Sequence, residues 1–139
     1  METYKFTYKD KAYELSEENF DYFENDEEEP VHGIDREKVM DLLKEAEEIS
    51  FDIEYYDSVC ERCLAGKAEK AKSFKFLEYH FFILTKEGNY VMSTISKEFK
   101  ATSATQLFKL GKADNSYIVS IAVCESCGTY SIEIEQCEV

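Results

Sequence analysis

The chain has 139 residues, of which 30 are acidic and 16 are basic, giving a formal net charge of −14 at pH 7. Hydrophobic residues make up 44% of the chain and include ten Phe and ten Tyr, which suffices for a core and excludes global disorder. One Pro and five Gly exclude a collagen-like or linker-dominated chain, and the length predicts a single domain over residues 1–139.

The amino-terminal region predicts a hairpin followed by an acidic loop. Aromatic and polar side chains alternate over residues 4–15 about a turn at residues 9–11, as in two short antiparallel strands. Ser16 is suited to cap a short helix that continues through Phe23, with acidic residues at the positive end of the helix. The acidic segment 14–29 contains nine carboxylates and no Lys or Arg, and its second half predicts a loop.

The next elements are a helix and a strand. Asp35 is a plausible N-cap, and an apolar stripe at helical spacing predicts a helix over residues 36–48. Residues 51–56 then alternate apolar and polar side chains, which indicates a strand with one solvent-exposed face. The stripe consists of Val39, Leu42, Leu43 and Ala46.

The second half of the chain predicts a sheet with one short helix. Residues 74–85 are apolar on both faces, as expected of a central strand, and residues 90–95 return antiparallel after a turn. Thr102 or Ser103 can cap a helix that ends near Leu110, where Gly111 is suited to stop it. Alternation over residues 115–123 and 130–134 predicts two further strands. The whole pattern indicates an α+β fold with an antiparallel or mixed sheet and two or three helices.

The charge is concentrated in the first part of the chain. Residues 1–54 hold 19 acidic and 6 basic residues, net −13, whereas residues 55–139 hold 11 and 10, net −1. This balance disfavours nucleic acid and anionic membranes as partners and favours a basic protein partner for the acidic region. The segment Arg62–Lys75 is the exception, with five basic residues against one acidic residue, net +4.

Two hypotheses follow from this basic segment. The acidic region could dock on it within the same chain. Alternatively, the protein is associated with nucleic acid through this surface, in which case Lys67, Lys70 and Lys72 would carry salt-dependent binding.

The sequence shows no targeting signal. Its opening residues lack the basic start and apolar stretch of a signal peptide. The longest run of clearly apolar residues, Phe81–Leu84, is far short of the ~20 that cross a bilayer. We therefore expect a soluble, cytoplasmic protein. In that reducing compartment its five cysteines are expected to be metal ligands or thiols rather than disulfides.

Four of the cysteines form two CxxC pairs, Cys60 with Cys63 and Cys124 with Cys127, and each pair follows a predicted strand. Two such turns can present four thiolates to one ion in the tetrahedral S₄ shell of structural zinc, as in a zinc ribbon. Gly128 helps the second turn to reach conformations that a Cβ would oppose. The 60 residues between the pairs are more than in a usual zinc module, so the two strand ends must be neighbours.

Other interpretations of these cysteines remain. Iron in the same S₄ shell is the first alternative to zinc, and redox dithiols or thiols packed as small apolar groups are the others. Neither pair begins an evident helix, which weakens the redox interpretation. Four cysteine ligands leave no position for water, which disfavours catalytic zinc.

The sequence offers little support for an enzyme. His32 is expected in a solvated loop, and His80 within the central strand is expected to hydrogen-bond inside the sheet, with a catalytic Glu78/His80 pair as a reserve hypothesis. No nucleophile elbow or glycine-rich phosphate loop is recognisable. Cys137, near the carboxyl end, is expected to be an exposed free thiol, with an additional ligand role as the alternative.

Several segments carry a resemblance to a known family. FDIEYY and CERCLAGK in the first half, together with FLEYHFFILTKEGNYV and NSYIVSIAVCESCGTYSIEIE in the second, resemble a small family of uncharacterised bacterial proteins, a domain of unknown function. The similarity runs through nearly the whole chain and includes both CxxC pairs. It implies a stand-alone cytosolic domain and supplies no substrate, cofactor or catalytic residue.

Overall fold

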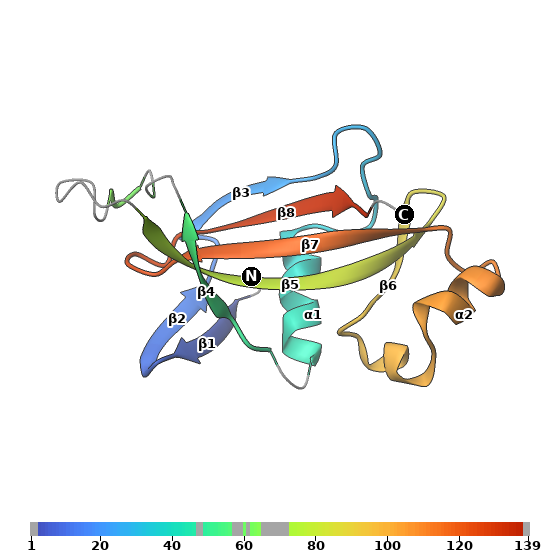
Figure 1. Ribbon diagram of the computed structural model, residues 1–139, viewed down its shortest axis with the longest axis horizontal. Coiled ribbons are helices and arrows are strands. Elements are labelled where there is room, and N and C mark those ends of the chain that lie inside the picture. Colours follow the sequence, from blue (N-terminus) through green and yellow to red (C-terminus); the bar gives the residue numbers. More distant parts are fainter. Residues whose placement is uncertain (1–2, 47–48, 57–59, 61, 65–72, 138–139) are drawn as a thin grey trace.

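A computed structural model describes residues 3–46, 49–56, 60, 62–64 and 73–137. In this part of the chain, a mixed six-stranded sheet is accompanied by a two-stranded hairpin, two α-helices and one 3₁₀ turn (Figure 1). The predicted α+β class with a mixed sheet is confirmed. The elements in chain order are β1 (Tyr4–Tyr8), β2 (Lys11–Leu15), β3 (Phe20–Glu24), α1 (Arg36–Glu45), β4 (Asp52–Tyr56), β5 (Phe74–Lys86), β6 (Asn89–Ser93), η1 (Lys97–Ala101), α2 (Ala104–Lys109), β7 (Asn115–Cys124) and β8 (Tyr130–Gln136).

Strand β5 is the centre of the sheet, as its apolar character on both faces predicts. It pairs antiparallel with β7 along most of its length, and its other edge is shared by β4 near its start and β6 near its end. Beyond β7 lies β8, which is antiparallel to β7, and then β3, which is parallel to β8. Because β4 and β7 both run antiparallel to β5, both end beside its first residues (Figure 1).

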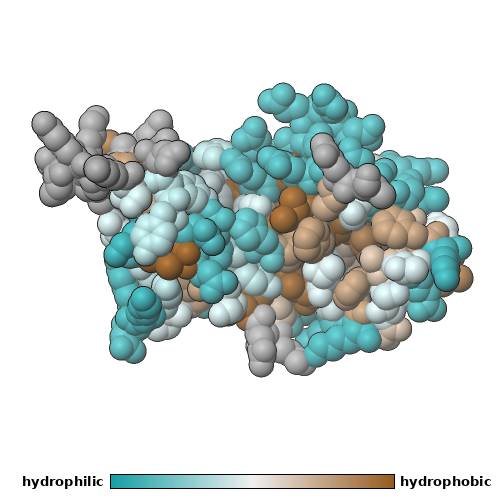
Figure 2. Space-filling view, viewed as in Figure 1, coloured by the Kyte–Doolittle hydropathy of each residue, from teal (hydrophilic) through white to brown (hydrophobic). Residues whose placement is uncertain are grey.

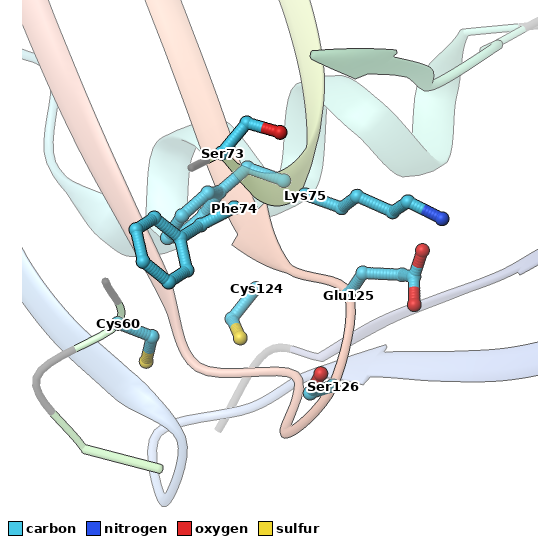
Figure 3. A pocket seen from close by; sticks show the side chains of 8 residues that line it. Cys60, Ser73, Phe74, Lys75, Cys124, Glu125 and Ser126 are labelled. Atoms are coloured by element: carbon cyan, nitrogen blue, oxygen red, sulfur yellow. The ribbon is translucent and has the colours of Figure 1, made fainter. Parts of the chain in front are cut away.

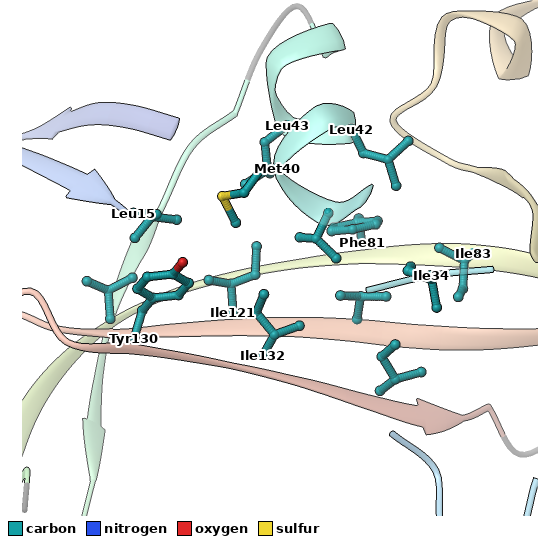
Figure 4. Close-up of a cluster of buried hydrophobic side chains, with 14 of the residues drawn as sticks. Leu15, Ile34, Met40, Leu42, Leu43, Phe81, Ile83, Ile121, Tyr130 and Ile132 are labelled. Carbon is teal, nitrogen blue, oxygen red and sulfur yellow. The ribbon is translucent and has the colours of Figure 1, made fainter. Parts of the chain in front are cut away.

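The main hydrophobic core lies between helix α1 and one face of the sheet (Figure 4). Asp35 caps the helix by accepting a hydrogen bond from the backbone N–H of Lys38, as predicted. Each aliphatic side chain that is fully buried contributes about 1.5–3 kcal/mol, so this layer fixes the helix on the sheet. The buried side chains include Val39, Met40, Leu42 and Leu43 from α1, and Leu77, Phe81, Ile83, Val119, Ile121, Val123, Ile132 and Ile134 from the strands.

The predicted amino-terminal hairpin is confirmed. β1 pairs antiparallel with β2 around Lys9 and Asp10, whose φ angles of 47° and 67° are those of a tight type I′ turn. Tyr13 and Leu15 of β2 are buried in the main core. The hairpin therefore belongs to the same layer as α1.

The prediction of a helix from Ser16 to Phe23 is wrong, because this segment forms a turn and then strand β3. Asn19 accepts hydrogen bonds from both the backbone N–H and the hydroxyl of Ser16, so that hydroxyl does not cap a helix. The aromatic residues that follow have high β propensity, and β8 supplies backbone partners for them. The tertiary pairing therefore overrides the local capping signal.

The two remaining helices differ less from expectation. α1 ends at Glu45, with Ala46 extended, whereas the predicted end at residue 48 lies outside the described residues. Ser103 caps α2 through the backbone N–H of Gln106, and Gly111 follows the helix with φ 70°, as predicted. None of the described helices is both long and apolar enough to cross a membrane.

The second face of the sheet is only partly covered. Leu107 of α2 packs there with Leu84 of β5 and Ala113, which forms a small second core at one end. Further along β5, the side chains of His80 and Phe82 lie on the same face and are exposed. We call this region the open face; the space-filling view shows apolar side chains at the surface between hydrophilic ones (Figure 2).

Candidate metal centre

The two CxxC turns meet at one end of the sheet, as the sequence requires of a shared site. Cys124 is the last residue of β7 and lies opposite Phe76 of β5. β4 ends at Tyr56, opposite Phe74 of β5, and the first turn begins four residues later at Cys60. The common partner β5 therefore explains how cysteines 60 residues apart come together.

The four sulfurs are arranged as ligands of a single ion. The ligand atoms of Cys60, Cys63, Cys124 and Cys127 all lie within 4.8 Å of one another. The closest approaches between the turns are 3.7 Å, from Cys60 Sγ to Cys127 Sγ and from Cys63 Sγ to Cys124 Sγ. A tetrahedron with metal–sulfur bonds of about 2.3 Å has edges of about 3.8 Å, so a metal ion fits at its centre with little rearrangement.

The two turns have the same backbone construction. The N–H of Leu64 donates to the carbonyl of Cys60 at 2.9 Å, and the N–H of Gly128 donates to the carbonyl of Cys124 at 2.9 Å. The residue after the second cysteine is left-handed in both turns, with φ 55° at Leu64 and 80° at Gly128. The predicted role of Gly128 is confirmed, whereas the strained Leu64 was not foreseen.

At both thiols of the second turn, burial and backbone hydrogen bonds act on the pKa in opposite directions, and the net shifts of the two thiols differ in sign. Burial raises the pKa of the Cys124 thiol to about 12, although the N–H groups of Cys127 and Ser126 oppose the rise. Burial also disfavours the Cys127 thiolate, but hydrogen bonds from the hydroxyl and N–H of Thr129 help to lower its pKa to about 7. Thr129 Oγ1 lies 3.1 Å from this sulfur. A divalent cation favours the thiolate at every ligand and so offsets the burial cost at Cys124.

The amino-terminal segment supports the second turn, which sequence reasoning missed. Lys11 Nζ donates to the carbonyl of Glu125 at 2.7 Å, and the hydroxyl of Tyr13 donates to the same oxygen at 3.0 Å. Asn19 Nδ2 donates to the carbonyl of Gly128 at 2.9 Å. These contacts span more than 100 residues of sequence, so no local motif could have indicated them.

The first turn is linked to the acidic segment by Arg62. Its guanidinium donates to the carbonyl of Phe20 at 3.3 Å and lies 3.6 Å from a carboxylate oxygen of Asp21. This ion pair joins the acidic region to the basic segment, as the hypothesis of docking within the chain predicts. Of the basic residues singled out for nucleic-acid binding, Lys67, Lys70 and Lys72 lie outside the described residues.

A small hollow lies beside the sulfurs (Figure 3). It has a volume of about 190 Å³, and its lining includes Cys60, Cys124 and the rings of Phe74 and Phe76. Small-molecule sites usually enclose about 300–1,000 Å³. The hollow is therefore better suited to shielding the sulfurs than to holding a substrate.

The other candidate residues lie away from the sulfurs. On the open face, the two ring nitrogens of His80 lie 2.8 Å from Glu78 Oε1 and 2.8 Å from Ser120 Oγ, so the expected hydrogen bonding within the sheet is confirmed. His32 is exposed, as expected, but its backbone bridges to β6. Cys137 is half-buried rather than exposed, and it is outside the group of cysteines that could hold a metal.

Comparisons with known proteins place the chain in a family. No curated protein and no solved structure matches it significantly. A family model described as "Protein of unknown function (DUF3785)" matches residues 4–139, and this span includes both CxxC turns. The chain therefore belongs to the DUF3785 family, a family of unknown function whose member here has four cysteines placed to hold a metal ion.

Proposed function

We propose that the protein holds one structural zinc ion in a zinc-ribbon-like S₄ site and acts in the cytoplasm by binding a basic protein partner. The observation that carries the zinc proposal is the convergence of four sulfurs, all within 4.8 Å, from two turns of equal backbone construction. Zinc favours four thiolates in tetrahedral geometry, and such a closed shell serves folding rather than catalysis.

The site would act as a cross-link in the fold. It joins the end of β7 to the turn after β4, two elements that otherwise share β5 as their common partner in the sheet. A small domain gains much of its stability from such a site, because metal binding at structural zinc sites contributes on the order of 10 kcal/mol to folding. With four thiolates and one divalent zinc ion, the formal charge of the protein changes from −14 to −16.

Metal analysis of the purified protein tests the zinc proposal. We expect one zinc per chain and no visible absorption, whereas iron in the same shell would give a coloured protein. The variant Cys60→Ser should lose the metal and much of the stability, and Cys137→Ser is the matched control because Cys137 lies outside the cluster. Metal-free protein that cycles between thiols and disulfides would contradict the proposal and favour a redox function.

The charge of the protein supports the partner proposal. Residues 1–54 carry 19 acidic against 6 basic residues, a density that attracts basic proteins and repels phosphate backbones. The test is binding of a labelled oligo-arginine peptide, with an oligo-glutamate peptide as the control. Failure of the oligo-arginine peptide to bind at low ionic strength would contradict this part of the proposal without affecting the zinc site.

A further inference from the structure

The open face of the sheet has an unusual combination of exposed aromatic rings and carboxylates. Tyr22 on β3 and Phe82 on β5 are 43% and 44% exposed, although their strands are paired within the sheet. Soluble proteins usually cover large aromatic side chains on a sheet, and exposed ones that gather on one face often mark a binding surface. The question is which partner this face fits.

Two tyrosine–glutamate pairs give the face its chemistry. The hydroxyl of Tyr22 donates to Glu133 Oε1 at 2.8 Å, and the hydroxyl of Tyr56 donates to Glu78 Oε2. The ring of Tyr56 is stacked on that of Phe76, with 4.5 Å between centroids. Each pair therefore presents an aromatic ring next to a carboxylate, which is the combination that binds cationic groups.

The two pairs act on the same region, although they come from strands at opposite edges of the sheet. Burial and the hydrogen bond to Glu78 raise the pKa of Tyr56, and the charges of Glu133 and Tyr22 raise it further. The strand register places the two glutamates near one another, because Glu133 of β8 is opposite Ser120 of β7, and Ser120 is opposite His80 of β5. The ring of His80 in turn contacts both Ser120 and Glu78.

The charge on this face excludes several partners. β3, β4, β7 and β8 contain no Lys or Arg, and the central part of β5 adds only the imidazole of His80. Arg62, which contacts β3 from the first CxxC turn, is already paired with Asp21. Nucleic acid, an anionic membrane and a second copy of the same face would all bring negative charge to it. The carboxylates that the strand register places here are Glu24, Asp52, Glu54, Glu78, Glu133 and Glu135.

We propose that the open face binds a Lys- or Arg-rich segment of a partner protein, with one cationic side chain held between Tyr56 and Tyr22 against Glu78 and Glu133. The inference rests on the proposed interaction with a basic protein and assigns the surface that makes it. Cation–π contacts supply about 0.5–2 kcal/mol for each cation, and complementary charge fixes which partners approach.

The test compares charge removal on the two sides of the molecule. Binding of a labelled oligo-arginine peptide is measured for wild type, for Glu78→Gln/Glu133→Gln, and for the control Asp10→Asn/Asp41→Asn. The control residues are exposed on the hairpin turn and on α1, and both double variants change the net charge equally. We expect the open-face variant to weaken binding about tenfold and the control less than about twofold.

Two further measurements keep the test decisive. The single variant Tyr56→Leu, which removes the aromatic ring but no carboxylate, should weaken peptide binding about threefold to tenfold through the lost cation–π contact. Metal content and thermal unfolding of every variant show whether the fold is retained. Amide chemical-shift changes on adding the peptide should map to β5, β7 and β8.

The outcomes separate this inference from the proposed function. Equal weakening by both double variants, or shift changes confined to the acidic loop at residues 24–29, would overturn the open-face site and leave a basic partner in place. No binding of the peptide by metal-loaded wild type would overturn both. Tighter binding of an oligonucleotide than of the peptide would also contradict this assignment.

Discussion

Leu64 and Gly128 occupy equivalent positions in the two CxxC turns, one residue after the second cysteine. Both are left-handed, with φ 55° and 80°, and both donate a backbone hydrogen bond of 2.9 Å to the carbonyl of the first cysteine. Glycine adopts this conformation freely, whereas a residue with a Cβ loses roughly 1–2 kcal/mol. The first turn therefore keeps the common geometry at a conformational cost that the second turn avoids.

The substitution Gly128→Ala tests this relationship. An added Cβ would lie 3.7 Å from Asn19 Nδ2, which is ordinary contact, so the cost comes from the backbone alone. We expect the zinc-loaded variant to lose about 1 kcal/mol of unfolding free energy in urea titrations. A loss above about 3 kcal/mol would show that the added Cβ clashes with its neighbours, and that the left-handed backbone is not the main cost.

The complementary variant is Leu64→Gly. The relief of left-handed strain is offset by the greater freedom of glycine in the unfolded chain, so stability should stay within about 0.5 kcal/mol of wild type. Because Leu64 is 45% exposed, little buried contact is lost. A strong destabilisation would mean that its side chain, and not its backbone, holds the first turn.

The buried hydroxyl of Tyr130 provides a second prediction. It donates to the carbonyl of Ser16 at 2.9 Å and accepts from Arg36 Nε at 2.6 Å, so it links the amino-terminal segment to the start of α1. Tyr130→Phe keeps the ring but removes both hydrogen bonds inside the core. We expect a loss of about 1–3 kcal/mol in chemical denaturation, because a buried charged group loses one of its acceptors.

A matched control for this prediction is Tyr90→Phe on β6. Tyr90 is half-buried and packs against the same core through its ring. We expect its loss of stability to stay below about 0.5 kcal/mol. Similar losses in both variants would mean that hydroxyl removal in general, rather than the link through Tyr130, is responsible.

The sequence predicted the parts of the fold that depend on short-range patterns. Alternation identified the hairpin, β7 and β8, and apolar character on both faces identified β5. Asp35 marked the start of α1, and Ser103, one of two predicted caps, marked the start of α2. The four metal-binding candidates were also predictable, because CxxC spacing is local and two copies imply one site. Their convergence followed from the requirement that two strand ends meet.

Features that depend on distant contacts were not predictable. Ser16 looked like a helix cap, but the side chain of Asn19 takes its hydrogen bonds and β8 recruits the next residues into a strand. The pairing of β3 with β8 joins segments about a hundred residues apart, and no local pattern encodes such a choice. The hydrogen bonds from Lys11 and Tyr13 to the second CxxC turn likewise join segments that are far apart in the sequence.

Asn19 gives a third prediction, which concerns metal affinity. Its Nδ2 donates to the carbonyls of Glu14 at 2.6 Å and Gly128 at 2.9 Å, so it fixes the turn that carries Cys127. Groups that orient metal ligands from outside the coordination shell typically change affinity by about 10–100-fold. We therefore expect Asn19→Ala to weaken zinc binding about tenfold in competition with a chromophoric chelator.

The control is Asn25→Ala, which removes comparable side-chain hydrogen bonds to the backbone of a loop that lies away from the sulfurs. Asn25 Nδ2 donates to the carbonyl of Val31 at 2.9 Å, and its Oδ1 accepts from the N–H of Val31 at 3.0 Å. This variant should lower stability without changing zinc affinity by more than about twofold. Equal affinity losses would mean that Asn19 acts only through general stability.

The last prediction concerns acid stability and Asp26, which joins the acidic loop to the end of β8. Hydrogen bonds from the backbone N–H groups of Glu29, Gln136 and Glu28 hold the pKa of this carboxyl below its ordinary value of 3.8. Because the folded pKa is lower than the unfolded one, the carboxylate stabilises the fold above the unfolded pKa. This contribution falls progressively below about pH 5 and is lost as pH passes through the folded pKa.

Asp26→Asn tests that contribution. The amide oxygen of the variant can still accept from the N–H groups of Glu28 and Glu29, but its Nδ2 cannot accept from Gln136. We expect the variant to be about 1 kcal/mol less stable than wild type at pH 6, with the difference shrinking as the pH falls below about 5. The exposed neighbour Glu27, changed to Gln, is the control for charge removal and should show no comparable dependence. A pKa of the Asp26 carboxyl at or above 3.8, measured by NMR, would contradict this prediction, because the hydrogen bonds to the ionised carboxylate would then be absent in solution.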